Sequence, residues 1–357
     1  MSRKKLLIDL SPLRLGYCGL WEYAYRFGST LLSINDPSEF DITFIAPSNH
    51  PFQTGASVKI MPLSFLGRQQ VKFIVPDHDL YHTIYHPSPF MPGKGFKGKY
   101  IFTIHDLNFL YVQSASKIQE YLKSYQSGLS HVDQLVFISN YAKKDAEKHL
   151  KYHAPSVLIY NGVAFAHDTE VKKPVRMKVV GSPFLFTLST FMRKKNIHAI
   201  VRMMAHLHEY HLVIAGKVIH TSYLEEVKRL VQELDLDRRV FFAGEITEIE
   251  KAWLYANCKA FLFPSIAEGF GIPPVEAMNY EKPVFVSNRT SLPEICGEHA
   301  FYWEKFVPKY MVEIFKTGMN RFENDPSYPE RLKNYAARYS WQTNVSKHLE
   351  LYRKVLT

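Results

Sequence analysis

The stretch FLFTLSTFMRKKNIHAIVRMM, residues 184–204, contains the unit from which this chain is built: an apolar run, a polar loop and a helical pattern. The run FLFTL is apolar almost throughout, which is typical of a strand buried on both faces of a sheet. After the loop, apolar residues recur at helical spacing: Ile197, Ile200, Val201, Met204 and Leu207. Asn196 stands where a helix N-cap is expected. The stretch therefore predicts a strand followed by a helix that begins after Asn196.

The same alternation extends over the rest of the chain. Before this stretch the apolar runs are KKLLIDLS (4–11), FDITFIAPS (40–48), VKIMPL (58–63), DLYHTIYH (79–86), YIFTIHDL (100–107), QLVFISN (134–140) and VLIYNGV (157–163). After it they are HLVIAGKV (211–218), RVFFAGEI (239–246), AFLFPS (260–265), PVFVSN (283–288) and HAFYWE (299–304). Helical patterns lie between many of these runs, and such alternation favours parallel sheets covered by helices. The predicted fold class is α/β, with two Rossmann-like, doubly wound parallel sheets in tandem.

The length also favours two domains, because 357 residues are more than one hydrophobic core usually holds. The weakest patterning lies at residues 165–183, a polar, charged stretch with two prolines that we interpret as the linker. We therefore predict a first domain over residues 1–170 and a second over residues 171–338. Ligands of doubly wound sheets bind beyond the carboxyl ends of the strands, so the two domains are expected to face a common cleft.

Composition indicates a soluble globular protein, since 46% of the residues are hydrophobic and 22% are charged. The three cysteines, Cys18, Cys258 and Cys296, are far apart, which argues against a disulfide framework or a zinc cluster. The N-terminal apolar run is too short for a signal peptide, and no stretch reaches the length of a membrane span. These features predict a cytoplasmic protein, or one peripheral on the inner face of the cytoplasmic membrane.

The formal net charge of +10 favours anionic partners: nucleotides, phosphorylated substrates or an anionic membrane surface. The sequence contains no recognisable RNA- or DNA-binding motif, so nucleic acid is not expected as a partner. It also contains no P-loop, nucleophile elbow or metal-ligand cluster, and we expect neither a metal nor another cofactor.

A glycine-rich turn between two acids is the first candidate site. In IAEGFGIPPVEAM (266–278), Glu268 and Glu276 bracket a loop formed by Gly269, Phe270, Gly271 and Ile272. Proline is tolerated in the first helical turn, so Pro274 is read as the start of a helix with Glu276 in its first turn. The free N–H groups at such a helix start can hold an anion. The alternative is an ordinary strand–helix turn with one capping and one solvated glutamate.

A run of cations, Arg193, Lys194 and Lys195, precedes the helix that begins after Asn196. Cations beside a helix N-terminus suit a phosphate or diphosphate, whereas the alternative is a solvated basic loop. Gly216 and Gly244 follow two further strand-like runs and would lie at the same edge of the sheet.

In the first domain, His105 and Asp106 end an apolar run, where the histidine could bind a polar ligand and the aspartate could orient it. The alternative is a structural histidine. Gly16 and Gly19 follow the first run and precede a helix, which resembles a loop that lets a ligand approach closely. The spacing is not GxGxxG, so a dinucleotide is not expected there.

Several of these segments resemble the retaining GT-B glycosyltransferases of family 4, also called glycosyltransferase group 1. The segments are EGFGIPPVEAM (268–278), EKPVFVSNRTSLPEICGEHA (281–300), STFMRKKN (189–196), IHDL (104–107), ISNYAKKD (138–145), IYNGV (159–163) and SWQTNVSKHLELYRKVL (340–356). In that family a Glu, seven residues and a second Glu bracket the donor-site loop, as Glu268 and Glu276 do here. Two positions depart from the family: Ser189 replaces a glycine and Lys194 an arginine, which loses bidentate phosphate contacts.

The resemblance implies a GT-B fold in which residues 171–338 bind a nucleotide-sugar donor, residues 1–170 lie on the acceptor side, and residues 339–357 form a helix that returns to the first domain. It implies that Lys195, Lys194 and Arg193 bind the diphosphate together with the 270–272 loop. Glu276 would bind the ribose, and Glu268 would bind the donor sugar. His105 would contact the same sugar. Transfer would retain the anomeric configuration and need no metal.

The resemblance favours GDP-mannose as donor, with a UDP-sugar next, and a glycan or lipid-linked saccharide as acceptor in cell-surface polysaccharide synthesis such as lipopolysaccharide. Three alternatives remain at this point: a sugar-nucleotide epimerase, a two-carboxylate hydrolase, and a protein that binds nucleotide-sugars without turnover. A hydrolase pair must flank a glycosidic bond, whereas these two acids flank an anion-binding turn.

Overall fold

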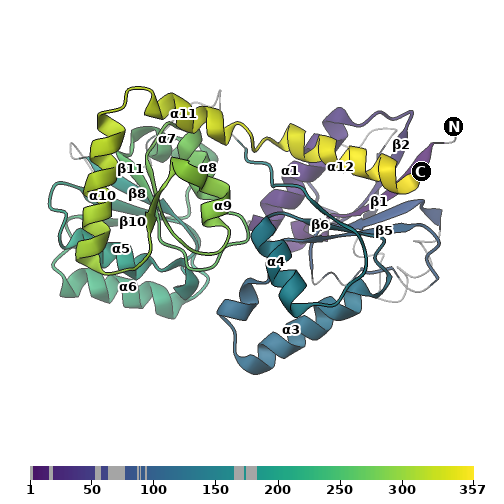
Figure 1. The fold of residues 1–357 in the computed structure, drawn as a ribbon, viewed down its shortest axis with the longest axis horizontal. Helices are drawn as coiled ribbons and strands as arrows, with labels where there is room; N and C mark the ends of the chain where they lie inside the picture. Colours follow the sequence, from purple (N-terminus) through teal and green to yellow (C-terminus); the bar gives the residue numbers. More distant parts are fainter. Residues whose placement is uncertain are drawn as a thin grey trace. The chain divides into compact units, whose positions relative to one another are not determined.

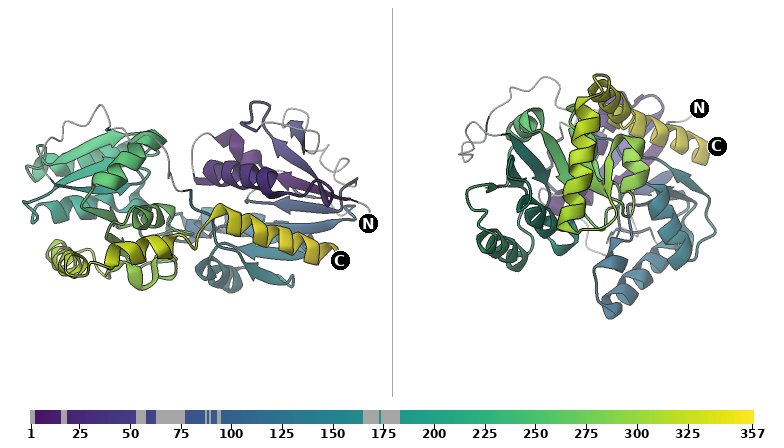
Figure 2. Two further views of the ribbon diagram at one scale, coloured as in Figure 1. Left: turned by 90° about the horizontal axis from the view of Figure 1, so that it is seen from above. Right: turned by 60° about the vertical axis from the view of Figure 1, so that its left-hand side comes forward.

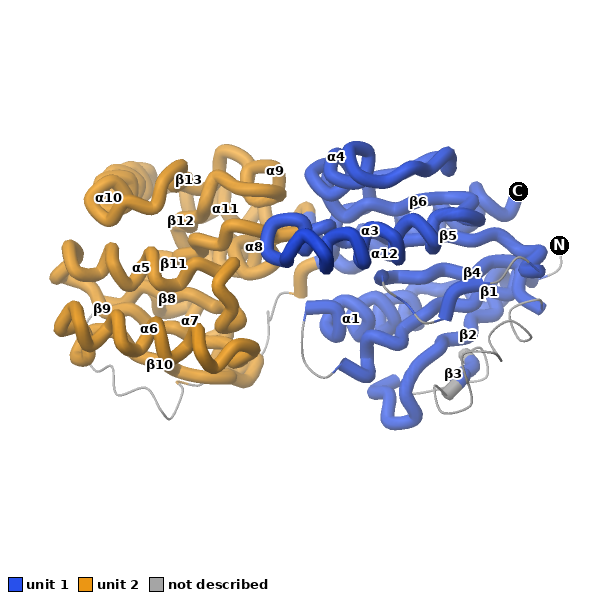
Figure 3. Tube along the Cα trace, turned by 90° about the horizontal axis from the view of Figure 1, so that it is seen from below, with its two compact units in different colours: residues 1–162, 339–357 blue, residues 163–338 orange. Residues whose placement is uncertain are grey.

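The computed structural model describes residues 3–15, 19–52, 58–62, 77–86, 88, 90–92, 95–164, 173 and 183–357. The chain divides into two compact units, one of residues 1–162 and 339–357 and the other of residues 163–338 (Figure 3). The predicted linker, residues 165–183, lies outside the described residues except at Lys173 and Pro183.

The first unit is a parallel sheet with the strand order β3-β2-β1-β4-β5-β6-β7, of which Figure 1 labels β1, β2, β5 and β6. Its strands are β1 (Lys4–Asp9), β2 (Phe40–Ala46), β3 (Val58–Pro62), β4 (Leu80–Thr83), β5 (Lys99–Ile104), β6 (Gln134–Phe137) and β7 (Ser156–Leu158). Its helices are α1 (Gly19–Ile34), α3 (Ala115–Gly128), α4 (Asn140–His149) and α12 (Trp341–Leu356), with short 3-10 turns η1 (Ser11–Leu15), η4 (Asn108–Tyr111) and η5 (Leu129–His131). The order of the strands reverses between β1 and β4.

The second unit repeats this plan with the strand order β10-β9-β8-β11-β12-β13, again all parallel. Its strands are β8 (Phe184–Leu188), β9 (His211–Ala215), β10 (Val240–Gly244), β11 (Ala260–Phe263), β12 (Val284–Ser287) and β13 (Phe301–Trp303). Its helices are α5 (Ile197–Met204), α6 (Thr221–Glu233), α7 (Glu248–Asn257), α8 (Ile272–Asn279), α9 (Leu292–Cys296), α10 (Pro308–Glu323) and α11 (Tyr328–Ala336), with 3-10 turns η6 (Arg193–Lys195) and η7 (Gly297–His299). Every apolar run read as a strand contains or overlaps one, which confirms the predicted fold class.

The sheet of the second unit is covered on both faces. Successive residues of a strand point to opposite faces. Leu185 of β8 belongs to a core shared with α5, α6 and α10. Its neighbour Phe186 packs edge-to-face against Tyr255 of α7, with ring centroids 5.2 Å apart. Burial on both sides explains why these strands are apolar at nearly every position.

In the first unit the last helix of the chain, α12, packs beside α1 (Figure 2). A buried polar cluster joins α12 to the sheet. The two ring nitrogens of His82 on β4 contact the Tyr352 hydroxyl at 2.6 Å and the Thr103 hydroxyl at 2.8 Å. The ring of His348 stacks on that of His82 at 5.4 Å. The return of residues 339–357 to the first unit therefore buries two histidines.

We expect this cluster to make the first unit sensitive to acid. Burial lowers the pKa of His348 from 6.5 to about 4 and lowers that of His82 as well. Because the folded state resists protonation, stability is complete above pH 6.5 and falls as the pH drops toward 4, by up to about 1 kcal/mol per pH unit for His348. Hydrogen exchange of α12 amides, corrected for its intrinsic pH dependence, should accelerate over this interval. In His348→Gln the slope should be smaller, and an equal slope would contradict the assignment.

Two further expectations concern cysteines and membranes. Cys258 and Cys296 are buried free thiols, and burial raises the pKa of each to about 12, whereas Cys18 lies outside the described residues. Within the described ranges, no helix has the length and apolar character needed to cross a membrane.

Candidate functional site

The loops that follow β8 and β11 lie together, because these neighbouring strands are the point at which the strand order of the second sheet reverses. Ligands of doubly wound sheets bind at such a point. The N–H of Ile266 donates to the carbonyl of Lys194 at 2.8 Å, and the Ser265 hydroxyl donates to the same carbonyl at 3.2 Å. These bonds fix the basic loop, residues 189–196, against the glutamate loop, residues 266–271, which carries Glu268.

Asn196 begins α5 in sequence, as predicted, but its side chain does not cap the helix. Its backbone is left-handed, with φ of 56°, and no capping hydrogen bond forms. Its side-chain amide instead donates to the carbonyl of Pro264 at 3.2 Å. The expectation of a capping side chain was wrong, because the asparagine serves as a third tie between the two loops.

Lys195 and Glu268 form an ion pair at the centre of this site. The lysine Nζ lies 2.5 Å from Glu268 Oε1, and the two side chains are only 15% and 12% exposed. Burial alone would raise the pKa of Glu268. The charges of Lys195 and Lys194, with hydrogen bonds from Lys195 and Ser265, outweigh burial and hold that pKa below its usual value of 4.5. The site therefore presents the Glu268 side chain as a carboxylate at neutral pH, paired with Lys195.

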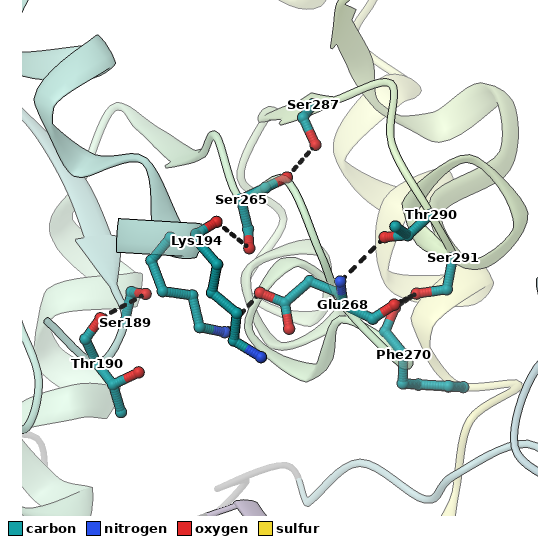
Figure 4. A network of polar contacts seen from close by, with 10 residues as sticks. Ser189, Thr190, Lys194, Ser265, Glu268, Phe270, Ser287, Thr290 and Ser291 are labelled. Carbon is teal, nitrogen blue, oxygen red and sulfur yellow. Dashed lines mark hydrogen bonds and ion pairs between the residues drawn. The ribbon is translucent and has the colours of Figure 1, made fainter. Parts of the chain in front are cut away.

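Hydroxyl groups from the loop after β12 hold the backbone of the glutamate loop (Figure 4). The N–H of Glu268 donates to the Thr290 hydroxyl at 3.0 Å. The buried Ser291 hydroxyl lies 3.0 Å from the carbonyl of Glu268 and 2.9 Å from that of Phe270. We did not predict these residues, although their position directly after a neighbouring parallel strand is a usable signal.

The helix after the loop starts two residues earlier than predicted. It begins at Ile272, not Pro274, and Gly271 precedes it with φ of 112°. A side chain at Gly271 would lie 2.6 Å from the Leu292 side chain, so glycine is required there. Pro273 and Pro274 have no N–H group, so Ile272 supplies the N–H of the first turn. Glu276 consequently lies beyond the first turn, and its predicted place there was wrong.

Glu276 is almost fully buried and bonded to α7. Lys251 Nζ lies 2.8 Å from its Oε1, and the Tyr255 hydroxyl donates to its Oε2 at 2.9 Å. Lys251 also lies 2.9 Å from Glu248 Oε2. The sequence motif identified Glu276 but gave no sign of Lys251 or Tyr255, which come from a different strand–helix connection.

The predicted cations separate. Arg193 turns to α6, where it pairs with Glu226 through two hydrogen bonds and lies over the ring of Tyr223, 5.6 Å from its centroid. Its side chain is 68% exposed. We therefore retain Lys194 and Lys195, rather than Arg193, as the cations beside Glu268.

Gly216 allows the end of β9 to approach Ser189 closely, and Gly244 at the end of β10 bonds to it. The N–H of Gly216 donates to the carbonyl of Gly244 at 2.8 Å. Gly216 has φ of 138°, and a side chain on it would lie 2.0 Å from the Ser189 carbonyl oxygen. The glycine is required by backbone geometry at this position.

We expect Gly216→Ala to lower the free energy of unfolding by about 1–3 kcal/mol from backbone strain, with the steric overlap adding to it. Gly19→Ala is the matched control, since an added methyl there meets no described atom within 4 Å. Urea unfolding followed by circular dichroism would measure both. Equal stability of the two variants would contradict the proposed constraint.

In the first unit, His105 Nε2 lies 2.7 Å from the Ile84 carbonyl, which can only accept, so Nε2 carries the proton. Burial lowers the pKa of His105, so the ring is neutral at pH 7 and Nδ1 is an acceptor. Asp106 Oδ1 accepts from the N–H of Asn108 at 2.8 Å. Gly19 is the first residue of α1, and Gly16 lies outside the described residues. The predicted contact of His105 with the donor sugar stays a prediction.

Among the residues that the structure describes, no group of three or more His, Cys, Asp or Glu side chains is arranged to hold a metal ion. The groups that the second-unit site offers to a ligand are the Lys195–Glu268 ion pair, Lys194 and the start of α8.

Comparison with known proteins relates the sequence to glycosyltransferases. "Serotype-specific mannosyltransferase WbdA" of Escherichia coli is 35% identical over 48% of this chain, but that match spans only 22% of WbdA. "O-antigen chain mannosyltransferase RfbU" of Salmonella typhimurium is 23% identical over 94% of this chain and 96% of its own. The structure of HepE of Anabaena in complex with UDP-glucose matches with a TM-score of 0.74 at 15% identity, covering 99% of this chain and 100% of HepE.

The structural likeness shows the fold, the two-sheet arrangement known as GT-B. The family model "Glycosyl transferases group 1" matches residues 168–339, which include the basic loop, the glutamate loop and α7. In this second unit, the chain is similar to the glycosyl transferases group 1 family.

Proposed function

We propose that this protein is a retaining glycosyltransferase that moves a hexose from a nucleotide-sugar to a glycan or lipid-linked saccharide. The observation that supports this most is the pair of Lys195 and Glu268, held at the reversal point of the second sheet within the residues that the family model matches. The pair combines the two charges that the reaction needs, one for the leaving group and one for the sugar.

Breaking the glycosidic bond of a nucleotide-sugar leaves negative charge on the diphosphate. We propose that the ammonium groups of Lys195 and Lys194 stabilise that charge, together with the N–H of Ile272 at the start of α8. A fixed cation in a water-poor site stabilises developing charge without further reorganisation. This role does not require a metal, because the lysines supply the positive charge.

Glu268 is proposed to act on the sugar. Its carboxylate is ionised at neutral pH, so it can accept hydrogen bonds from sugar hydroxyls and offset positive charge that develops on the ring. Glu276 is proposed to accept hydrogen bonds from the ribose. In the mechanism implied by the family, the acceptor attacks from the face of the leaving group and the phosphate takes its proton, so no side chain acts as a covalent nucleophile.

GDP-mannose is the proposed donor, since two relatives, WbdA and RfbU, are named mannosyltransferases. A UDP-sugar is the next candidate, since HepE was solved with UDP-glucose. A thermal-shift panel of UDP, GDP and their sugars would decide between them. We expect GDP and GDP-mannose to raise the melting temperature more than their UDP counterparts, and the reverse order would reject the mannose assignment.

The proposed reaction is tested by incubating the protein with nucleotide-sugars and an extract that contains lipid-linked saccharides. We expect a glycosylated product with the anomeric configuration of the donor. An inverted product would overturn the retaining mechanism. Turnover without any acceptor would favour the epimerase or the hydrolase, and binding without turnover would favour the non-catalytic protein.

We also propose that the protein binds peripherally to anionic membrane, where a lipid-linked acceptor would be found. The formal net charge of +10 supports this proposal, because basic proteins are attracted to the cytoplasmic leaflet. In a flotation assay we expect binding to vesicles of phosphatidylglycerol but not of phosphatidylcholine. Equal recovery with both lipids would contradict it.

A further inference from the structure

We propose that Lys251 of α7 is a positioning residue for nucleotide recognition. It holds the Glu276 side chain in the orientation in which its carboxylate accepts hydrogen bonds from the ribose hydroxyls. This inference rests on the proposed function, in which Glu276 binds the ribose. It adds a residue that lies outside the glutamate loop, 25 positions before Glu276 in the chain.

The geometry fixes the carboxylate at both oxygens. Lys251 Nζ lies 2.8 Å from Glu276 Oε1, and the Tyr255 hydroxyl lies 2.9 Å from Oε2. Each oxygen of a carboxylate can accept two hydrogen bonds. One site on each oxygen therefore remains for a ligand, and the two neighbouring hydroxyls of a ribose have the matching pair of donors.

The electrostatics give Lys251 a second role. The side chain of Glu276 is 8% exposed and that of Lys251 18% exposed, so both charges lie largely out of water. A buried carboxylate without a partner is costly, and it would also repel a negatively charged nucleoside diphosphate. Lys251 balances this charge before the ligand arrives.

Lys251 remains charged in this environment. Burial alone would lower its pKa, but the charges of Glu276 and Glu248 and the hydrogen bonds to them outweigh burial and raise it. The lysine therefore keeps the positive charge that faces the Glu276 carboxylate.

The helix that carries Lys251 is held by other contacts. A capping box closes its start, with the Thr247 hydroxyl accepting from the N–H of Glu250 and the Glu250 carboxylate accepting from the N–H of Thr247. Ala252, Leu254 and Tyr255 are buried on its inner side. Lys251→Met keeps the apolar stem of the side chain and removes the charge, so the variant tests the ion pair in a helix that is otherwise intact.

The test compares GDP with 2′-deoxy-GDP, and UDP with 2′-deoxy-UDP, by isothermal titration calorimetry. We expect the wild type to bind the ribonucleotide of its own base about 10–100-fold more tightly than the deoxy form, as for a hydrogen bond to a charged group. In Lys251→Met we expect this ratio to fall to about threefold or less. In the transfer assay KM for the donor should rise about tenfold with kcat little changed, because the ribose lies away from the reacting bond.

Lys228→Met is the matched control. Lys228 also pairs with a glutamate, Glu225 at 2.9 Å, but on the exposed surface of α6. We expect it to keep the wild-type ratio. Tyr255→Phe removes the bond to the other oxygen while leaving the lysine in place, and we expect an intermediate ratio, which keeps the proposal testable if Lys251→Met does not fold.

A full ribose preference in Lys251→Met, or in Tyr255→Phe should the first variant not fold, would overturn this inference and leave the proposed function standing. A wild type that binds neither nucleotide would overturn the proposed function and the inference together.

Discussion

Replacing Lys195 by methionine is expected to lower kcat/KM for the nucleotide-sugar by about 10²–10³-fold, the loss typical of removing one preorganised group that stabilises developing negative charge. The side chain is only 15% exposed and lies 2.5 Å from Glu268, so bulk water cannot replace its charge. Affinity for the nucleoside diphosphate should fall as well, because the diphosphate carries its charge in the ground state too. Steady-state transfer kinetics and calorimetric titration with the nucleotide measure the two effects.

A second variant separates catalysis from folding. Lys195→Met leaves the carboxylate of Glu268 buried without its partner, which costs about 3–5 kcal/mol in comparable pairs. The double variant Lys195→Met with Glu268→Gln removes both charges, so stability should recover while transfer stays as low as in Lys195→Met or lower. Recovery of transfer together with stability would contradict a direct role for Lys195.

Glu268→Gln is expected to reduce kcat by about 100-fold or more while leaving KM for the donor within a few-fold of the wild type, since an interaction made mainly in the transition state affects kcat. The amide keeps the size of the side chain and its contact with Lys195 but cannot offset positive charge on the sugar ring. Single-turnover measurements with a saturating donor would isolate this step.

The matched control is Glu226→Gln. Glu226 also pairs with a cation of the basic loop, Arg193, but on the exposed side at α6. We expect it to transfer sugar at the wild-type rate. Undiminished transfer by Glu268→Gln, or an equal loss in Glu226→Gln, would show that the site has been placed wrongly.

The fold could be predicted from the sequence because burial of the strands leaves a direct pattern in it. Strands of a parallel sheet are buried on both faces, and runs such as FLFTL and AFLFPS are apolar for that reason. The return of residues 339–357 to the first unit was expected only from the family resemblance, and the structure places α12 beside α1 there.

Helix starts were less predictable, because they depend on contacts distant in sequence. Asn196 has the residue type and the position expected of an N-cap. Its side-chain amide nevertheless donates to the Pro264 carbonyl, and its backbone is left-handed. Likewise, α8 starts at Ile272 rather than Pro274, after Gly271, whose φ of 112° favours glycine.

The sequence predicted the motif residues of the candidate site but not the residues that surround them. Lys195 and Glu268 were both singled out, and the structure joins them in one ion pair. Cations that are close in sequence have different partners, since Arg193 pairs with Glu226 instead. Lys251 carries no motif of its own and becomes visible only when α7 and α8 are packed together.

Transfer of sugar from a nucleotide-sugar at this site is tested most directly by measuring nucleoside diphosphate release and acceptor glycosylation in the same reaction. With GDP-mannose or, failing that, a UDP-sugar, and an extract of lipid-linked saccharides, we expect one nucleoside diphosphate released for each sugar attached to the acceptor, with both lost in Glu268→Gln. Nucleotide-sugar consumed without acceptor product, or release undiminished in Glu268→Gln, would contradict it.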